Sequence, residues 1–343
     1  MNSAAISRPP CGISAIVVSY NGAPFIRRCL ESLAQSSVKL DLIVVDNHST
    51  DDTREIVSRF DGVKLIENSE NVGFGRACNI GISYALANSA AYVLLLNQDA
   101  IIEPTMVEML LRSMQAESKI GIACPLQFDS DGKTIDHKFL LYYMAPFASR
   151  LISDGLREML QCSYVVEMSP AAAWLISAAC LREIGGFDPL FFMYFEDDDM
   201  SRRANYHGYH TVIVPAARFS HLRAFHGKRQ ESPWRRLKTR TSWIRSFLVA
   251  SAKMPAGNPF ENLYHAVTEQ LCLGLASLAG HLQLIPTAAC VLATCGTIME
   301  LPRILRHRRI ALTKGAHWFP NVADITGKKD VLKKLSESCA STN

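Results

Sequence analysis

The sequence predicts an α/β fold, in which a mostly parallel, Rossmann-like sheet is flanked by helices and followed by a helical C-terminal extension. Three features support this prediction. Apolar runs rich in β-branched residues alternate with helical patterns in the first half of the chain, polar residues follow these runs, and the composition changes after His221. Continuous apolar strands separated by helices are typical of a parallel sheet that is covered on both faces.

Each expected element is recognised by a local pattern. A strand is an apolar run that stops at turn residues, and a helix is an amphipathic stretch that opens with a proline or a capping residue. Strands are expected at residues 13–19, 42–45, 63–66, 92–96 and 211–215, and helices at 24–33, 50–60 and 74–87.

The composition indicates a folded globular protein. Its 343 residues suffice for one large domain or two ordinary ones, and 48% are apolar and 20% charged. A net charge of +4 is too modest to indicate a nucleic-acid binder. The ten cysteines lack zinc-type spacing and the N-terminus lacks the pattern of a secretory signal, so a reducing, cytoplasmic location is expected.

The expected domain boundaries follow from changes of composition. Nine Lys or Arg and one acid lie between Arg218 and Arg245, whereas residues 270–299 carry no charge. The expected units are a flexible N-terminus at 1–12, a main domain at 13–230 with halves at 13–125 and 126–230, and a basic and apolar helical extension at 231–343.

Polar residues gather at the ends of three expected strands. Parallel sheets of this kind bind ligands outside the carboxyl ends of their strands, although such residues also form ordinary turns. Their recurrence at three ends favours a ligand site, and an acid after a buried strand suits Mg²⁺ or Mn²⁺. These residues are Ser19, Tyr20, Asn21, Asp46, Asn47, Asn97, Gln98 and the acid Asp99.

A run of four acids, Glu196 to Asp199, follows the aromatic run Phe191 to Phe195. Four adjacent carboxylates are more than a helix N-terminus needs, because they repel one another. Aromatic neighbours exclude water and raise the pKa of a carboxylate toward that of a general base. The run therefore predicts a catalytic carboxylate, and the alternative is a helix start that pairs with Arg202 or Arg203.

Two weaker signals accompany these motifs. Gly73 and Gly75 begin a helix, where glycine lets the backbone approach a phosphate, and Arg76 adds positive charge. The alternative is an ordinary glycine-containing loop. His221 follows the late strand and is a candidate metal ligand, although a lone histidine is more often structural.

In this order, the motifs resemble those of the inverting glycosyltransferase family 2, which has the GT-A fold. They are most similar to its rhamnosyltransferase-like members, which build bacterial surface polysaccharides such as O-antigen and cell-wall glycans. The resemblance covers about residues 13 to 225. The matching segments are 16–21, 44–50, 71–81, 96–99, 185–188, 194–199, 208–209, 214–217 and His221.

The resemblance implies a role for each candidate residue. It makes 13–125 the nucleotide-sugar half of the catalytic domain and 126–230 the acceptor half. Asp197 matches the catalytic base, and Asp99 and His221 match metal ligands. The implied nucleotide-binding residues are Ser19, Tyr20, Asn21, Asp46, Asn71, Gly73, Arg76, Asn97 and Gln98. The acceptor side is expected to involve Trp174, Tyr194, Glu196 and Asp198.

The implied reaction is direct displacement at the anomeric carbon. A base removes the proton of the acceptor hydroxyl, and Mg²⁺ or Mn²⁺ stabilises the leaving nucleoside diphosphate. The expected donor is dTDP-rhamnose, with a UDP-sugar as the alternative, and the acceptor is a glycan or a lipid-linked oligosaccharide. The chain departs from the family pattern at Asn97, where many members have an Asp, and at Ala171, Ser177 and Ala178, where relatives often have Gly and an Arg-Arg pair.

The charge-free stretch at 270–299 is long enough to span a bilayer. Its glycines, polar residues and Pro286 favour two shorter helices instead. Basic residues on both sides suit an anionic leaflet, which predicts peripheral attachment to the inner face of the cell membrane. The alternative is a packed helical hairpin with solvated basic ends.

Two other functions stay open at this point. A sugar nucleotidyltransferase would use a similar sheet and metal, but typically has a glycine-rich loop and a Lys after its first strand, where this chain has Ser19 to Gly22. A non-catalytic, membrane-bound partner on a transferase fold would have no need of Asp99, Asp197 and His221. The sequence predicts no oligomeric state.

Overall fold

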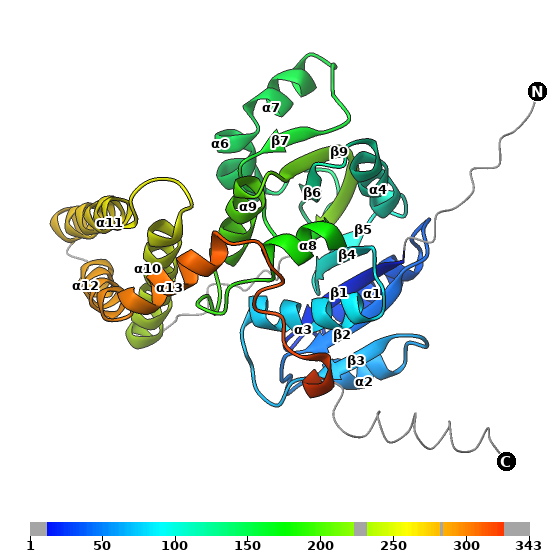
Figure 1. Cartoon of the computed structure of the whole chain (residues 1–343), viewed down its shortest axis with the longest axis horizontal. Coiled ribbons are helices and arrows are strands. Elements are labelled where there is room, and N and C mark those ends of the chain that lie inside the picture. The colour runs from blue at the N-terminus through cyan, green and yellow to red at the C-terminus, as the bar shows by residue number, and fades with distance from the viewer. Residues whose placement is uncertain (1–11, 223–231, 282–283, 326–343) are drawn as a thin grey trace, which may run out of the picture.

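The computed structural model describes residues 12–222, 232–281 and 284–325 (Figure 1). Except for Gly12, the expected flexible N-terminus lies outside the described residues, and so does the expected boundary at residue 230. The first β-α-β units form as expected. Helix α3 spans Phe74–Ala87, as predicted, whereas α1 (Ile26–Ala34) and α2 (Thr53–Ser58) are shorter than expected.

Within the described residues the strands form one nine-stranded sheet, ordered β3-β2-β1-β4-β8-β6-β9-β5, with β7 paired to β9. Strands β3, β2, β1 and β4 are parallel, and so are β6 and β9. Strand β8 is antiparallel to β4 and β6, and β5 and β7 are antiparallel to β9, so the expected α/β sheet is present and is mixed. The strands are β1 Ile13–Ser19, β2 Asp41–Asp46, β3 Lys64–Glu67, β4 Tyr92–Asn97, β5 Ala100–Ile102, β6 Ile120–Phe128, β7 Tyr164–Val166, β8 Ala173–Ser177 and β9 His210–His221.

Helices cover both faces of the sheet, which is why its central strands are apolar throughout. In β1, Ile16 belongs to the core under α3, and its neighbour Val17 belongs to the core under α1 and α4. Helix α3 packs so closely that a Cβ on Gly81 would lie 2.5 Å from the Ile16 side chain. The further helices of this domain are α4 Met106–Ala116, α5 His137–Phe139, the π-helix η1 Leu140–Met144, α6 Ala145–Phe147, α7 Ser149–Leu156, α8 Ala178–Ile184 and α9 Glu196–Tyr206.

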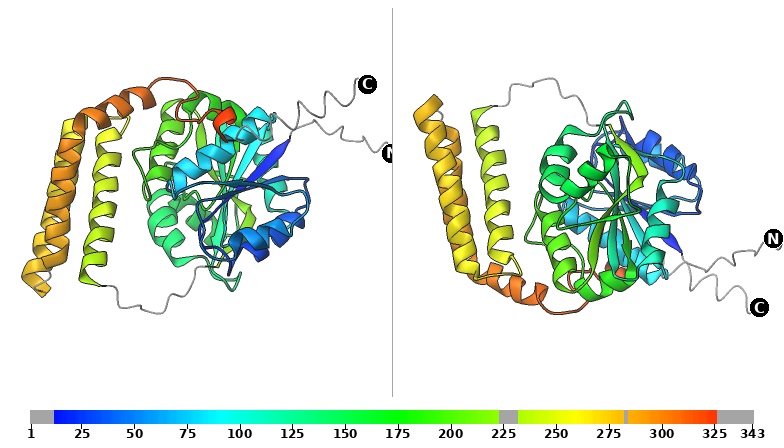
Figure 2. Two further views of the ribbon diagram at one scale, coloured as in Figure 1. Left: turned by 90° about the horizontal axis from the view of Figure 1, so that it is seen from below. Right: turned by 90° about the horizontal axis from the view of Figure 1, so that it is seen from above.

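The C-terminal extension forms a helical layer beside the α/β body (Figure 2). Its helices are α10 Pro233–Lys253, α11 Pro259–His281, α12 Leu284–Met299 and α13 Leu301–Ala311. The expected break near Pro286 is confirmed, because α11 ends at His281 and α12 begins at Leu284. None of the described helices is long and apolar enough to cross a membrane alone; α12 and α13 pass that test only as a pair, bent by 68° at their junction.

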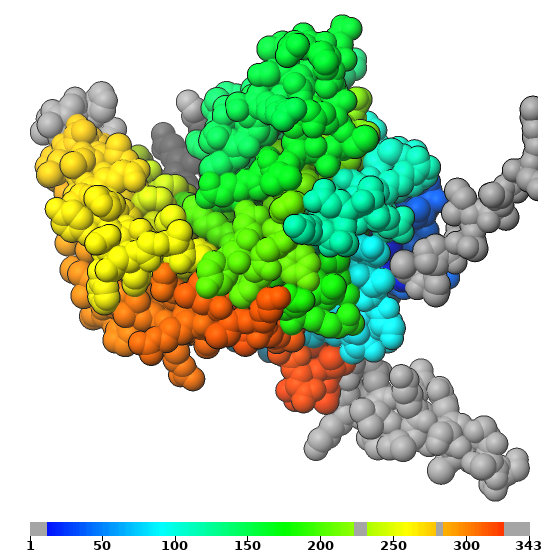
Figure 3. Space-filling view, turned by 45° about the horizontal axis from the view of Figure 1, so that its top comes forward, coloured from blue at the N-terminus to red at the C-terminus, as the bar shows by residue number. Residues whose placement is uncertain are grey.

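A third apolar core joins the extension to the body. It contains Leu190 and Phe191 from the body and Leu248 from α10. Beyond α13 the chain returns to the body, where the His317 carbonyl accepts a hydrogen bond from the Gly186 amide at 2.9 Å. The extension therefore contacts the body through α10, α13 and the segment that follows α13, whereas α11 and α12 pack on α10. The space-filling view shows the extension lying against the body (Figure 3).

Candidate active site

The three polar strand ends meet at one edge of the sheet, as the sequence predicts. Strand β1 lies between β2 and β4, and Ser19 stands in register with Asp46 while Val18 stands in register with Asn97. Parallel neighbours bring their carboxyl ends to the same edge, so residues distant in sequence become neighbours.

Gln98 connects the end of β4 to the end of β1 by hydrogen bonds. Its Oε1 accepts hydrogen bonds from the Ser19 hydroxyl at 2.6 Å and from the Tyr20 amide at 3.0 Å, and its Nε2 donates to the Tyr20 carbonyl at 3.2 Å. These bonds occupy the buried Ser19 hydroxyl. The Tyr20 side chain stays half-exposed beside them, with 47% of its surface free.

Asn47 links the end of β2 to the glycine-containing loop before α3. Its Nδ2 donates to Asn71 Oδ1 at 2.9 Å, and its Oδ1 accepts from the Val72 amide at 3.0 Å. Asn71 Oδ1 in turn accepts from the Gly73 amide at 3.0 Å. The family resemblance implies no role for Asn47, but the structure makes it the residue that shapes this loop.

Asp46 is a buried acid with an incomplete set of partners. Its Oδ2 accepts from the Ser49 amide at 3.1 Å and lies 3.9 Å from the Arg54 guanidinium. Its Oδ1 has no hydrogen-bond partner among the described residues. A buried oxygen without a partner is costly, so this atom suits a donor from a bound ligand.

A cavity of about 240 Å³ opens at this edge of the sheet. Seven of the residues singled out from the sequence line it: Tyr20, Asn47, Asn71, Gly73, Asn97, Gln98 and Asp99. Gly73 adopts a φ of 87°, and a Cβ there would lie 2.4 Å from the Phe192 carbonyl oxygen, so only glycine fits. Asn21 is elsewhere: its Oδ1 accepts from the Thr50 amide at 2.9 Å and ties two loops together.

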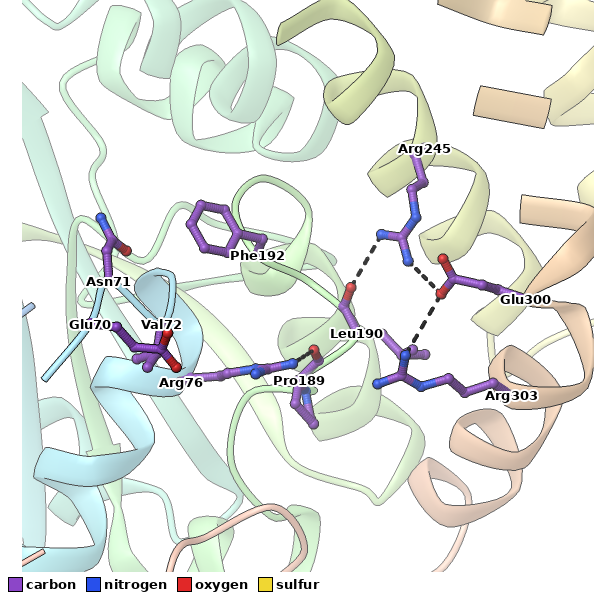
Figure 4. A pocket seen from close by; sticks show the side chains of 10 residues that line it. All are labelled: Glu70, Asn71, Val72, Arg76, Pro189, Leu190, Phe192, Arg245, Glu300 and Arg303. Atoms are coloured by element: carbon purple, nitrogen blue, oxygen red, sulfur yellow. Dashed lines mark hydrogen bonds and ion pairs between the residues drawn. The ribbon is translucent and has the colours of Figure 1, made fainter. Parts of the chain in front are cut away.

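Arg76 lines a neighbouring cavity of about 250 Å³, which Figure 4 shows from close by. Its guanidinium donates to the Pro189 carbonyl at 2.8 Å. On the opposite side, Arg245 binds Glu300 at 2.7 Å. The two cavities share Asn71, so Arg76 lies next to the strand-end cavity and not within its lining.

Asp99 and His221 lie together, as expected for a metal pair. Antiparallel pairing of β5 with β9 sets Ala100 opposite His221, and His221 Nε2 lies 3.0 Å from Asp99 Oδ1. Among the described residues, no group of three His, Cys, Asp or Glu side chains converges to hold a metal. Mg²⁺ commonly uses one or two protein ligands together with substrate phosphates, so the pair suits a metal that the donor helps to bind.

Gln127 supports His221 from the other side, and sequence reasoning missed it. Its amide nitrogen lies 2.8 Å from His221 Nδ1, and its buried Oε1 has no partner among the described residues. If the Gln127 amide is turned by 180°, its Oε1 accepts a hydrogen bond from the Nδ1–H of His221. The Nε2 atom of His221 then carries no proton and can bind a metal. The residue sits within the apolar strand β6, where one polar side chain was the only signal.

The four acids at the start of α9 have different environments. Asp199 binds Arg203 at 2.9 Å, which confirms one of the two expected arginine partners. Burial, with the neighbouring charge of Asp197, raises the pKa of Glu196 to about 8 and that of Asp198 to about 7. One acid is thus neutralised by a cation, and the others are held in a region that favours protonated carboxyl groups.

Asp197 accepts hydrogen bonds from the amides of Ala171 at 3.3 Å and Asp198 at 3.0 Å, and interacts with the Tyr143 hydroxyl. Burial raises the pKa of Asp197, and these donors oppose the rise. Tyr143 lies on the π-helix η1, in a region whose sequence pattern is irregular, so the sequence does not indicate it. Such helices often occur at functional sites.

Of the residues predicted to contact the acceptor, some lie at the surface and one lies in the core. Tyr194 is exposed, and Glu196 and Asp198 lie at the start of α9. Trp174 is fully buried on β8, where it stacks on Phe187 at a ring distance of 6.3 Å and donates to Ser169 Oγ at 3.0 Å. The prediction that Trp174 contacts an acceptor is therefore wrong, because no acceptor can reach it.

Comparison with known proteins places this geometry in context. The sequence model described as Glycosyl transferase family 2 matches residues 14–184. The N-acetylglucosaminyl-diphospho-decaprenol L-rhamnosyltransferase of Mycobacterium tuberculosis is 28% identical over 242 residues, which cover 62% of this chain and 76% of that protein. Rhamnosyltransferase WbbL of Escherichia coli is 25% identical over 227 residues, covering 62% and 84%.

Solved structures share the fold. The S. aureus TarS fragment 1-349 superposes with a TM-score of 0.56 at 14% identity, covering 88% of each chain. The mannosyltransferase PcManGT of Pyrobaculum calidifontis, in complex with GDP-Man and Mn²⁺, superposes with a TM-score of 0.51 at 20% identity and covers 88% of this chain and 84% of that one. The mixed sheet with its helical layers is thus an architecture common to these proteins.

Proposed function

This chain belongs to glycosyltransferase family 2 and is a glycosyltransferase, and we propose that it transfers rhamnose from dTDP-rhamnose to a glycan or lipid-linked acceptor of a cell-surface polysaccharide. The observation that carries the proposal is the strand-end cavity, which brings Asp99, with His221 beside it, together with polar residues from three strands. The names of the two rhamnosyltransferase relatives support the choice of sugar.

The nucleotide of the donor would occupy this cavity. The half-exposed Tyr20 ring offers a face for stacking, and the unpartnered Asp46 Oδ1 beside the cavity suits an N–H or hydroxyl of the nucleoside. Gly73, which lines the cavity, allows its loop to pack against Phe192 and so to stay in place beside the ligand. Arg76, at the adjoining cavity, supplies positive charge near the donor's expected position.

Asp99 and His221 would hold Mg²⁺ or Mn²⁺ together with oxygens of the donor diphosphate. When bound, the metal supplies positive charge that stabilises the leaving nucleoside diphosphate. Asn97 lines the same cavity without a charge, so the protein contributes one carboxylate where many family members contribute two. The site then depends on the diphosphate for part of its metal affinity.

Asp197 would act as the general base. Burial raises the pKa of Asp197, so its carboxylate is a stronger base than that of an ordinary aspartate. It would accept the proton of the acceptor hydroxyl while that oxygen attacks the anomeric carbon from the side opposite the diphosphate, which inverts the configuration. Tyr143 and the Ala171 amide would hold the carboxylate in place during the transfer.

The exposed surface of the extension supports the proposal that the acceptor is lipid-linked. The exposed residues of α12 follow helical spacing and form one apolar stripe: Leu284, Ala288, Val291, Leu292, Cys295, Ile298 and Met299. Arg306 and Arg309 are exposed on the next helix, α13. An apolar stripe with nearby basic residues suits peripheral contact with an anionic membrane, where such an acceptor would be found.

The test is a donor screen with the full chain. The protein is incubated with dTDP-rhamnose, UDP-sugars or GDP-sugars, a lipid-linked acceptor, and Mg²⁺ or Mn²⁺, and release of nucleoside diphosphate is measured. We expect release from dTDP-rhamnose, and its loss in excess chelator and in Asp99→Ala. Saturation by a UDP-sugar without any response to dTDP-rhamnose would overturn the donor assignment. Formation of a nucleotide sugar from a sugar phosphate would indicate a nucleotidyltransferase. Inactivity with every donor would indicate a non-catalytic partner.

A further inference from the structure

The backbone just before the predicted base is strained. Tyr194 and Phe195 have φ values of 72° and 65°, in the left-handed region that favours glycine. Two consecutive non-glycine residues in this region persist only where surrounding contacts hold them. Phe195 is the N-cap of α9, and its side chain makes no capping hydrogen bond. Contacts from elsewhere must therefore fix the direction in which α9 begins.

Helix α10 of the extension supplies those contacts. Ser246 Oγ donates to the Met193 carbonyl at 3.1 Å, one residue before the strained pair. The Phe195 ring packs against Trp243 at 5.3 Å and Phe247 at 5.6 Å. Arg245 reaches the same segment at the Leu190 carbonyl, as Figure 4 shows. Helix α10 therefore contacts this loop at Leu190, Met193 and Phe195.

Lys253, at the end of α10, holds the segment beyond the strained pair. Its side chain is completely buried, and its ammonium group lies 2.6 Å from Asp199 Oδ1 and also pairs with Asp188. Asp199 is in the first turn of α9, two residues after Asp197. Asp188 is bound on its other side by His307 of α13 at 2.7 Å. A buried ion pair with this geometry is costly to break, so it fixes the relative position of α9 and α10.

We propose that α10 is part of the catalytic apparatus, with Ser246 and Lys253 as positioning residues that set the orientation of the Asp197 carboxylate. Neither residue lines the donor cavity. They act through the backbone of residues 193–195 and through Asp199, so their loss displaces the base. Met193 also lines the donor cavity, so a smaller effect on the nucleotide site accompanies the displacement. The inference rests on the proposed role of Asp197 as base.

The experiment compares two serines one helical turn apart. Ser246→Ala removes the hydroxyl that binds Met193, and Ser242→Ala removes an exposed hydroxyl from the same helix and serves as the control. Displacement of a catalytic group by a fraction of an ångström is expensive, so we expect Ser246→Ala to lower kcat by about tenfold. The donor KM and the affinity for dTDP should change by much less than kcat, because Met193 is one residue of a cavity lining that comes mostly from the strand ends. Ser242→Ala should behave as wild type.

A double-mutant cycle separates positioning from general structural damage. If Ser246 acts through the base, Ser246→Ala causes no further loss in an Asp197→Asn background. A second tenfold loss there, or an unchanged kcat in Ser246→Ala alone, would overturn the proposal. Should circular dichroism show that Ser246→Ala does not fold, Trp243→Leu, which loosens the packing on Phe195, takes its place in the same cycle. Normal turnover in Asp197→Asn itself would instead refute the base assignment.

Discussion

The strand-end cavity and the acidic start of α9 are built in different ways. The cavity is shaped mainly by hydrogen bonds between strand ends in the first 100 residues, such as Gln98 to Ser19 and Asn47 to Asn71, with Met193 added from the loop before α9. The start of α9 depends on partners from the middle of the chain and from the extension, including Ala171 and Lys253. The base should therefore be more sensitive than the donor side to changes in the extension.

Removal of the base carboxylate should have the largest effect and should separate the two regions. Asp197→Asn is expected to lower kcat by about 10² to 10⁴, because general-base catalysis has this magnitude. Binding of dTDP, measured by calorimetry, should persist, because Asp197 does not line the cavity. Asp198→Asn is the control and should cost much less. Near-normal turnover in Asp197→Asn, together with loss of turnover in Glu196→Gln, would show that the base is Glu196 and not Asp197.

A change behind the metal pair should affect the donor side alone. Gln127→Leu removes the polar partner of His221 Nδ1, and loss of such a supporting group typically costs about 10- to 100-fold in metal affinity or activity. We expect the Mn²⁺ concentration for half-maximal activity to rise by that factor, with near-normal kcat at saturating metal. Substitution of a polar residue outside the cavity, Thr105→Leu, should leave the metal requirement unaltered. An unchanged requirement in Gln127→Leu would exclude His221 as a ligand supported in this way.

The extension also offers a test at the α12 stripe. The double variant Leu284→Asp with Leu292→Asp puts charges on exposed apolar positions, so folding should be retained. Each leucine buried in a lipid interface contributes about 1.5 to 3 kcal/mol, so binding to anionic vesicles in a sedimentation assay should fall by at least about tenfold. Val165→Asp changes an equally exposed residue of the body and is the control. If the full-length protein does not bind anionic vesicles, the stripe is instead a surface that contacts another protein.

The smallest effect concerns stability and pH. Burial holds the folded-state pKa of Glu196 at about 8, above its ordinary value of 4.5. The folded state therefore binds a proton that the unfolded state has released, so stability from this group is complete below pH 4.5 and is lost as pH rises toward 8. Glu196→Gln should make the melting temperature fall less between pH 5 and pH 8.5, whereas the exposed control Glu261→Gln should change nothing. An identical pH dependence in Glu196→Gln would show that Glu196 is not buried in this way.

Much of the donor side could be predicted from the sequence. Apolar runs identify the strands because burial on both faces requires it, and parallel neighbours necessarily end at one edge. These rules predicted that polar residues gather at that edge, and the structure places Tyr20, Asn97 and Asp99 in the lining of one cavity there. Pairing of Asp99 with His221 was implied by the family resemblance, and the β5–β9 register explains it.

The acceptor side depended on contacts between residues distant in sequence. Nothing local distinguishes Trp174, which is buried in the core, from an aromatic residue at an acceptor site. Tyr143 lies in an irregular stretch, and Gln127 within an apolar strand, so neither has a pattern that indicates its partner. The sequence by itself determined the strands, their shared edge and the position of the acidic run, because these depend on local periodicity. Only the tertiary structure decided that Asp199 is the acid of this run that Lys253 neutralises, because that pairing requires α9 and α10 to meet.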